Sequence, residues 1–216
     1  FAEAMTTLPH PSPPLEGEGV LGAPALPSPA TSEETLHISL FCYDTAPVGP
    51  WLDALAASPQ VCVCYVPPGK PLAAVRAHLG GDGPWQLGRA RIEPIPFLAL
   101  DDYDRLLWRC DINFVRGEDS FVRGQWAGKP FIWQIYRQEE DAHLVKLAAF
   151  LDRCCPQGAW RRMHEAWNTG ENLAAAWQDF MAERQAIATV AQAWRKRLAA
   201  LPDLAASLVK FADKRL

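Results

Sequence analysis

The chain has 216 residues, a length that suits one sizeable domain with appendages. Its formal net charge at pH 7 is -4, so bulk charge gives no support to a nucleic-acid-binding surface. The sequence has no run of about 18 apolar residues and no basic leader before an apolar stretch, so we expect neither a membrane span nor a secretory signal.

The first segment, residues 1–34, is predicted to be a linker. It is rich in Pro, Gly, Ser and Glu and poor in aromatic and β-branched residues. Such a composition cannot bury enough apolar surface to offset the entropy lost on ordering, and proline blocks both helix continuation and sheet pairing. We therefore expect extended or disordered chain there, which would join the rest of the protein to something upstream.

Short apolar runs alternate with helical patterns from residue 36 onward. Five runs are predicted to be strands: residues 36–43, 61–66, 89–97, 112–115 and 130–136. The segments between them are predicted helices: residues 51–58, 71–79, 101–110 and 119–128. This alternation predicts an α/β fold with an open, mostly parallel sheet. The strands are apolar nearly throughout, as expected where helices cover both faces of a sheet.

The remainder of the chain is predicted to be a helical C-terminal tail. Apolar residues recur at helical spacing in residues 141–154, 159–167, 172–201 and 202–216. Pro202 is expected to begin the last helix. In the helix at 119–128, Asp119 or Ser120 is the expected cap and Gly128 the expected stop.

The cysteines and histidines give no metal signature. Six cysteines are present without paired C-x-x-C spacing, and Cys62 and Cys64 alternate on one face of a strand. We predict buried, reduced thiols in a cytosolic protein. None of the five histidines lies at ligand spacing from a cysteine or from another histidine, so no metal site is predicted.

Ligands of open α/β sheets bind beyond the carboxyl ends of the strands, so the residues after each predicted strand are the candidates. They are Phe41 and Tyr43, Phe97 with Asp101 and Asp102, the run Arg116-Gly117-Glu118-Asp119-Ser120-Phe121, and Tyr136 with Gln138, Glu139 and Glu140.

The run RGEDSF at residues 116–121 is the densest of these groups. Gly117 lets backbone approach a ligand closely, and the helix that starts at Asp119 and Ser120 offers free N–H groups to an anion. Arg116 adds donors suited to phosphate, and Glu118 can accept hydrogen bonds from sugar hydroxyls. These parts fit a nucleotide diphosphate-sugar, with aromatic rings for its base. A plainer interpretation stays open, in which Asp119 only caps the helix and Arg116 only pairs with an acid such as Glu118.

The other candidates have plain structural interpretations. The tryptophans of the C-terminal helices are predicted to pack in the core: Trp160, Trp167, Trp177 and Trp194. By themselves, Phe41 and Phe97 fit core positions better than ligand contacts. Asp101 and Asp102 fit the first turn of a helix better than an acid–base pair.

Residues 113–151 read NFVRGEDSFVRGQWAGKPFIWQIYRQEEDAHLVKLAAFL. This segment closely resembles the C-terminal domain of the elongation factor P arginine rhamnosyltransferases, whose signature runs RGEDSFVRxQWAGKPFxWxIYxQE. The resemblance extends back through PFLALDDYDRLLW and, more weakly, through SLFCY at residues 39–43. It covers roughly residues 36–200 and leaves out the Pro-rich start.

The resemblance implies a Rossmann-like domain, residues 35–216 here, of a two-domain GT-B glycosyltransferase that inverts the sugar configuration without a metal. The implied donor is dTDP-β-L-rhamnose and the implied acceptor is an arginine of translation elongation factor P in the cytoplasm. By matching position, Phe97 would line the thymine site, Phe41 and Tyr43 the donor pocket, and Tyr103 its edge. Ribose, pyrophosphate and rhamnose would be bound by Arg116, Glu118, Asp119 and Ser120.

Several positions depart from the family pattern. Gln134 stands where the family usually has His, Arg137 where it has Pro, and Leu100 or Asp101 where a Gln is common. The family's catalytic aspartates lie in an N-terminal domain to which nothing here corresponds. An arginine nitrogen needs carboxylates to orient it and take its proton. We therefore expect this chain, which begins with Phe1, to be the donor-binding half and to transfer no sugar alone.

Two other functions stay open at this point. One is a GT-B transferase that uses a different nucleotide-sugar. The other is a non-catalytic α/β module that binds a protein partner through its helical tail. If the resemblance holds, the stretch at residues 171–198 is expected to cross to the other domain and to leave an apolar face exposed in this chain.

Overall fold

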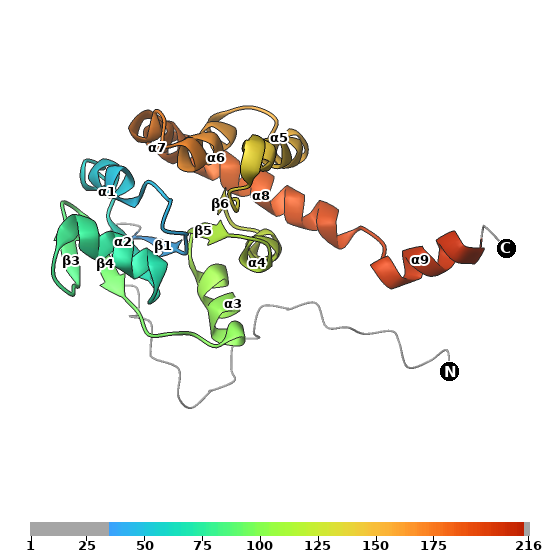
Figure 1. Cartoon of the computed structure of the whole chain (residues 1–216), viewed down its shortest axis with the longest axis horizontal. Helices are drawn as coiled ribbons and strands as arrows, with labels where there is room; N and C mark the ends of the chain where they lie inside the picture. The colour runs from blue at the N-terminus through green and yellow to red at the C-terminus, as the bar shows by residue number, and fades with distance from the viewer. Residues whose placement is uncertain (1–34, 214–216) are drawn as a thin grey trace.

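Six strands form one sheet in the computed structural model, which describes residues 35–213; the predicted linker at residues 1–34 lies outside that range. The strand order is β3-β4-β2-β1-β5-β6 (Figure 1). The strands are β1 (Leu36–Leu40), β2 (Cys62–Val66), β3 (Trp85–Leu87), β4 (Ala90–Pro94), β5 (Ile112–Arg116) and β6 (Phe131–Gln134). All neighbours pair in parallel except β3 and β4. The predicted mostly parallel α/β sheet is thereby confirmed.

Strand β3 is absent from the sequence prediction. It spans three residues of a Gly-rich segment, too few to show an alternating pattern. A tight turn at Gly88, with φ of +55°, folds it back antiparallel onto β4 at the edge of the sheet.

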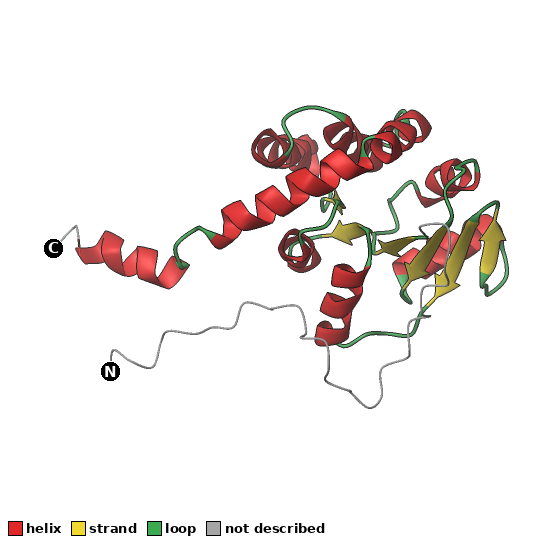
Figure 2. Cartoon of the chain, turned by 180° about the vertical axis from the view of Figure 1, so that it is seen from behind, coloured by secondary structure: helices red, strands yellow, loops and turns green. Residues whose placement is uncertain are grey.

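Helices cover both faces of the sheet. The strands are linked through α1 (Val48–Ala56), α2 (Lys70–Leu79), α3 (Leu100–Arg109) and α4 (Asp119–Ala127). Helix α1 packs against α2, and α3 against α4. Parallel strands are joined by right-handed crossovers. The chain crosses the sheet in one direction up to β4 and in the other direction from β5 on, so α3 and α4 lie on the face opposite to α1 and α2 (Figure 2).

The tail is helical, as predicted. After a short 3₁₀ turn (Glu139–Asp141) come α5 (Ala142–Cys154), α6 (Ala159–Thr169), α7 (Leu173–Ala182), α8 (Arg184–Ala199) and α9 (Leu204–Asp213). The single helix expected at residues 172–201 is two helices that meet at Glu183, whose φ and ψ of -96° and 6° break the helical path. Helix α9 begins after Pro202, because the carboxylate of Asp203 accepts the backbone N–H of Ala205 at 2.6 Å and caps it.

Aromatic rings fill the space between the sheet and the tail. Trp51 of α1 lies 4.7 Å from Phe114 of β5, and Trp167 of α6 lies 4.5 Å from the same ring (centroid distances). Trp160, Trp167 and Trp177 are buried as predicted, and Trp194 packs half-buried against the same core. All six cysteines are buried free thiols.

The end of the tail leaves this core. Helix α8 buries only Ile187 and Ala191, and α9 buries no side chain within residues 35–213. Both helices extend away from the sheet (Figures 1 and 2). The apolar face expected at residues 171–198 is wrong for most of that stretch, because α7 packs against α1 and α6 and only Val190 is an exposed large apolar side chain there. The other exposed apolar side chains of this end lie further along the chain: Leu201, Leu204, Leu208, Val209 and Phe211. Within the described range, no helix is long and apolar enough to cross a membrane.

Candidate functional site

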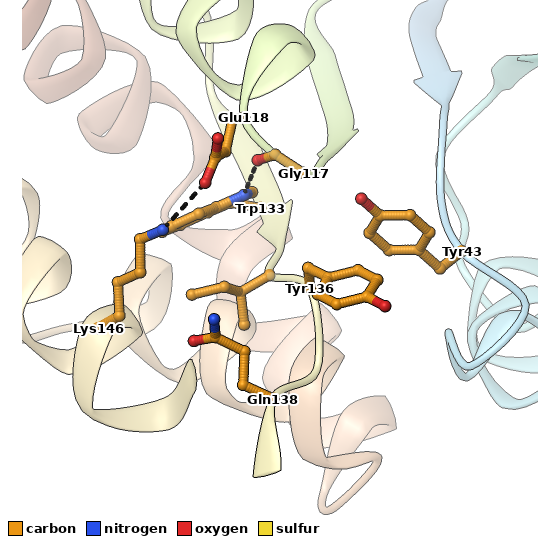
Figure 3. A pocket seen from close by; sticks show the side chains of 8 residues that line it. Tyr43, Gly117, Glu118, Trp133, Tyr136, Gln138 and Lys146 are labelled. Carbon is orange, nitrogen blue, oxygen red and sulfur yellow. Dashed lines mark hydrogen bonds and ion pairs between the residues drawn. The ribbon is translucent and has the colours of Figure 1, made fainter. Parts of the chain in front are cut away.

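A pocket of about 260 Å³ opens where the chain reverses its direction across the sheet. From β1 the chain winds through β2 to β4, then returns to the other side of β1 as β5. The crevice between β1 and β5 is therefore the topological switch point, where α/β proteins bind ligands. The pocket is lined by Tyr43, Gly117, Glu118, Trp133, Ile135, Tyr136, Gln138 and Lys146 (Figure 3).

Gly117 closes the floor of the pocket between β5 and α4. Its φ is +59°, and a Cβ there would lie 2.6 Å from the hydroxyl oxygen of Tyr43. Its carbonyl accepts the indole N–H of Trp133 at 2.6 Å (Figure 3). Both the backbone angle and the space therefore require glycine at this position.

The first turn of α4 carries open backbone donors beside this floor. Glu118 occupies the N-cap position and makes no side-chain cap hydrogen bond, and the expectation that Asp119 or Ser120 is the cap is wrong. The hydroxyl of Ser120 instead donates to the carbonyl of Arg116 at 2.5 Å and accepts its N–H at 2.9 Å. Asp119 bonds Arg123 one turn along at 2.9 Å. The helix start is thus free to face an anion. Gly128 ends the helix in the left-handed conformation, as predicted.

Arg116 does not pair with Glu118. Its guanidinium carbon lies 4.1 Å from the ring centroid of Phe41 and 4.8 Å from that of Tyr43. Its Nη1 donates to the carbonyl of Cys42 at 2.9 Å. Arg116 therefore packs against the segment after β1 and fixes its two aromatic rings. Its predicted contact with phosphate stays a prediction.

Charged and aromatic groups frame the mouth of the pocket. Lys146 of α5 donates to the carboxylate of Glu118 at 3.2 Å, and both side chains are exposed. The ring of Tyr136 stands edge-on to that of Tyr43, with centroids 5.8 Å apart. On the other side, Lys70 pairs with Asp44 at 3.0 Å and lies over the Tyr43 ring. The pocket lining thus offers the carboxylate of Glu118, the ammonium of Lys146 and two tyrosine rings to a polar ligand.

Only Tyr43 and Glu118 of the eight predicted site residues line the pocket, and the other six lie outside its lining: Phe41, Phe97, Tyr103, Arg116, Asp119 and Ser120. Phe97 is 85% exposed in the loop between β4 and α3, so its interpretation as a core residue is wrong. Tyr103 of α3 packs behind Phe41, with ring centroids 5.6 Å apart, and Phe41 itself is half-buried. Within the described range the Tyr103 hydroxyl has no hydrogen-bond partner, and its burial raises the pKa of Tyr103. Asp101 and Asp102 occupy the first turn of α3, as predicted.

Sequence reasoning missed some pocket residues. Trp133 lies inside a predicted strand and Lys146 inside a predicted helix, where neither residue type is unusual. Gln134, buried in β6, carried a signal as a polar side chain in an apolar run. Within residues 35–213, no three His, Cys, Asp or Glu side chains are grouped in a way that could hold a metal ion.

Known proteins resemble this chain over most of its length. The family model for the elongation factor P (EF-P) rhamnosyltransferase EarP matches residues 22–213. A protein-arginine rhamnosyltransferase of Pseudomonas putida is 44% identical over 192 residues, which are 82% of this chain and 50% of that protein. Its counterpart in Pseudomonas aeruginosa is 44% identical over 185 residues, or 81% of this chain and 49% of that protein.

A solved structure shows the same fold. It concerns the structural basis for EarP-mediated arginine glycosylation of translation elongation factor EF-P, and it matches with a TM-score of 0.70 at 39% identity. The match covers 87% of this chain and 63% of that one. The chain spans about half the length of the curated relatives it matches.

Proposed function

This chain belongs to the family of EF-P rhamnosyltransferases, EarP, and from that premise we propose that it binds dTDP-β-L-rhamnose for transfer to an arginine of translation elongation factor P. The observation that carries the proposal is the pocket at the β1–β5 switch point, whose floor and wall are Gly117 and Glu118 of the RGEDSF run. The relatives named above are protein-arginine rhamnosyltransferases, and their similarity supports the choice of reaction.

The donor is proposed to bind with its diphosphate over the first turn of α4. Free N–H groups and the positive end of the helix dipole suit an anion there. A volume of about 260 Å³ lies below the roughly 300–1,000 Å³ of pockets that enclose a whole ligand. We therefore assign the pocket to the diphosphate and rhamnose, and the thymine to the region of the exposed ring of Phe97.

The proposed reaction is a direct displacement. The acceptor nitrogen attacks the anomeric carbon while the bond to the diphosphate oxygen breaks on the opposite face, so the sugar configuration inverts. The nitrogen gives up its proton to a carboxylate, and the leaving dTDP takes the electron pair of the broken bond. The first turn of α4 stabilises the negative charge that develops on the leaving group. The proposal includes no metal ion and no other cofactor.

The proposed whole enzyme has a GT-B arrangement of two domains in the cytoplasm. The exposed apolar side chains of α9 supply a surface on which a second domain can pack. Six free thiols suit a reducing compartment. Because Glu118 is already paired with Lys146, the carboxylates that orient the acceptor are proposed to come from outside residues 35–213.

Calorimetric titration tests the donor site. We expect this chain to bind dTDP-β-L-rhamnose and dTDP, and to bind UDP-glucose much more weakly. Equal binding of UDP-glucose would indicate a transferase with another donor. A folded chain that binds none of the three would contradict the donor site and favour a protein-binding module.

Mass spectrometry tests whether this chain transfers rhamnose by itself. With purified elongation factor P and dTDP-β-L-rhamnose, we expect this chain alone to leave the acceptor unmodified. Addition of one rhamnose to the acceptor by this chain would show that it carries its own catalytic carboxylate.

A further inference from the structure

Gln134 is a buried amide at the carboxyl end of β6. Its side chain is 4% exposed, and it stands in register with Arg116 of β5. Beyond the end of β5, its Oε1 accepts the backbone N–H of Tyr43 at 2.7 Å, and its Nε2 donates to the hydroxyl of Thr45 at 3.1 Å. A side chain of β6 therefore holds the segment that follows β1.

The chemistry of these bonds fixes the orientation of the amide. A backbone N–H can only donate, so the amide oxygen must face Tyr43 and the amide nitrogen must face Thr45. Because both ends of the buried amide are engaged within the protein, Gln134 does not contact a ligand itself. Its effect on a ligand must pass through Tyr43.

Tyr43 is the pocket wall that these bonds hold in place. Its hydroxyl lies against Gly117, and its ring meets Tyr136 across the pocket. Arg116 secures the neighbouring carbonyl of Cys42. The N–H of Tyr43 belongs to the same peptide group as that carbonyl, so Arg116 and Gln134 hold this peptide group from its two sides.

We propose that Gln134 is a positioning residue that holds Tyr43 in the conformation that binds the donor. The inference rests on the proposed function for the identity of the ligand. The hydrogen bonds of Gln134 on which it is built do not depend on that identity. It also says which side chains can replace Gln134. The replacement must offer a hydrogen-bond acceptor to the N–H of Tyr43, and that acceptor atom must not be protonated.

Two substitutions separate this role from simple packing. Gln134→Met keeps the shape and removes both hydrogen bonds. Gln134→His keeps an acceptor nitrogen only while the imidazole is neutral, since the protonated ring carries two donors. An unperturbed imidazole is half protonated near pH 6.5, and burial lowers that value, so the ring at this buried position stays neutral at mildly acidic pH. The second variant thus restores the acceptor that the first one removes.

The matched control is Gln125 of α4, a second buried glutamine. Its Oε1 accepts the indole N–H of Trp194 at 3.0 Å, away from the residues that line the pocket. Gln125→Met and Gln125→His make the same chemical changes and report any general effect on the fold.

Affinity for dTDP is measured by calorimetry at about pH 8 and about pH 5.5, on either side of histidine titration. We expect Gln134→Met to weaken binding roughly three- to tenfold relative to the wild type at both values, the effect of leaving one wall of the pocket to be ordered by the ligand. Gln134→His should match the wild type at both pH values, because burial keeps its ring neutral and its acceptor nitrogen free of a proton. Both Gln125 variants should bind like the wild type.

Hydrogen exchange at the Tyr43 amide gives a readout without ligand. Its protection factor should fall in Gln134→Met at both pH values and stay at the wild-type level in Gln134→His. If the wild type binds no dTDP but protection falls in this pattern, the donor site fails and the positioning role stands. The role of Gln134 is overturned if Gln134→Met protects the Tyr43 amide as well as the wild type does. It is also overturned if the wild type binds dTDP and Gln134→Met binds it equally well.

Discussion

Arg116 illustrates how one side chain can organise a pocket without lining it. Its planar guanidinium lies over Phe41 and Tyr43 and holds the carbonyl of Cys42. The same contact places a positive charge beside a buried thiol, yet burial still raises the pKa of Cys42 to about 12. Arg116 itself is half-buried, and its planar guanidinium can stack on the rings of Phe41 and Tyr43 while its edge bonds the carbonyl.

Replacing Arg116 with lysine is expected to weaken donor binding about tenfold or more. Lysine keeps the charge but lacks the plane that stacks and the fork that bonds a carbonyl, so the segment after β1 would lose its support. Calorimetry with dTDP measures the change. The control is Arg161→Lys, since Arg161 of α6 makes ion pairs with Asp152 and Glu165 and lies outside the pocket lining. Full affinity in Arg116→Lys would show that charge alone suffices.

Gly117→Ala is expected to abolish detectable donor binding and to lower the free energy of unfolding by roughly 1–2 kcal/mol. The left-handed backbone accounts for that loss of stability, while the new methyl group would displace the Tyr43 hydroxyl from the pocket wall.

Gly170→Ala is the matched control for this substitution. Gly170 has φ of +82°, and nothing lies within 4 Å of the Cβ that alanine would add. It should show the loss of stability without the loss of affinity. Equal affinities in the two variants, measured by calorimetry and urea unfolding, would contradict the steric role of Gly117.

His164 makes the stability of the domain sensitive to mild acid. It is fully buried among aromatic rings, and burial lowers its pKa from 6.5 to about 4. As pH falls from about 6.5 towards about 4, the unfolded chain binds a proton that the folded chain excludes, so the free energy of unfolding decreases. The loss from this one group amounts to about 3 kcal/mol at the acid end of the window.

His164→Met removes this titration. Urea unfolding between about pH 7 and about pH 4 should show a shallower dependence on pH in the variant than in the wild type, whatever the offset between them at neutral pH. Identical slopes in the two proteins would mean that the His164 imidazole is already protonated in the fold or that its pKa stays near the unfolded value.

At the scale of elements, the sequence was sufficient where a signal is local. Five strands followed from apolar runs, and the end of α4 followed from Gly128, because burial and backbone angle leave a mark at each position. The RGEDSF run was found because it joins a predicted strand to a predicted helix, where ligands bind. Those parts of the candidate site could be predicted without a structure.

Other features depend on contacts between distant segments, and they could not be predicted. Gln134 and Tyr43 are far apart in the chain, and their hydrogen bond exists only because β1, β5 and β6 end side by side. The pairing of Lys146 with Glu118 likewise requires α5 to lie beside the start of α4. The cap of α4 was misassigned for a local reason, because the hydroxyl of Ser120 bonds the backbone of Arg116, four residues earlier, and not the first turn of the helix.

The whole molecule divides into a packed body and an unpacked end. Aromatic residues from α1, β5, α6 and α7 meet in one core. By contrast, α9 presents Leu204, Leu208 and Phe211 to solvent at spacings of four and three residues, which places them along one side of the helix. A short helix with such a stripe gains little stability by itself, because much of its apolar side is exposed to solvent.

The double substitution of Leu204 and Leu208 with glutamine should therefore leave this chain's fold and its affinity for dTDP unchanged. In contrast, Phe180→Gln, at a fully buried position of α7, should lower the free energy of unfolding by at least about 3 kcal/mol. Light scattering should show that the wild-type chain associates at high concentration and that the double variant associates less, because exposed apolar side chains promote contacts between copies. If the double variant unfolded in less urea than the wild type, these two side chains of α9 would have to pack on the body of the domain, and they would not be available to a second domain.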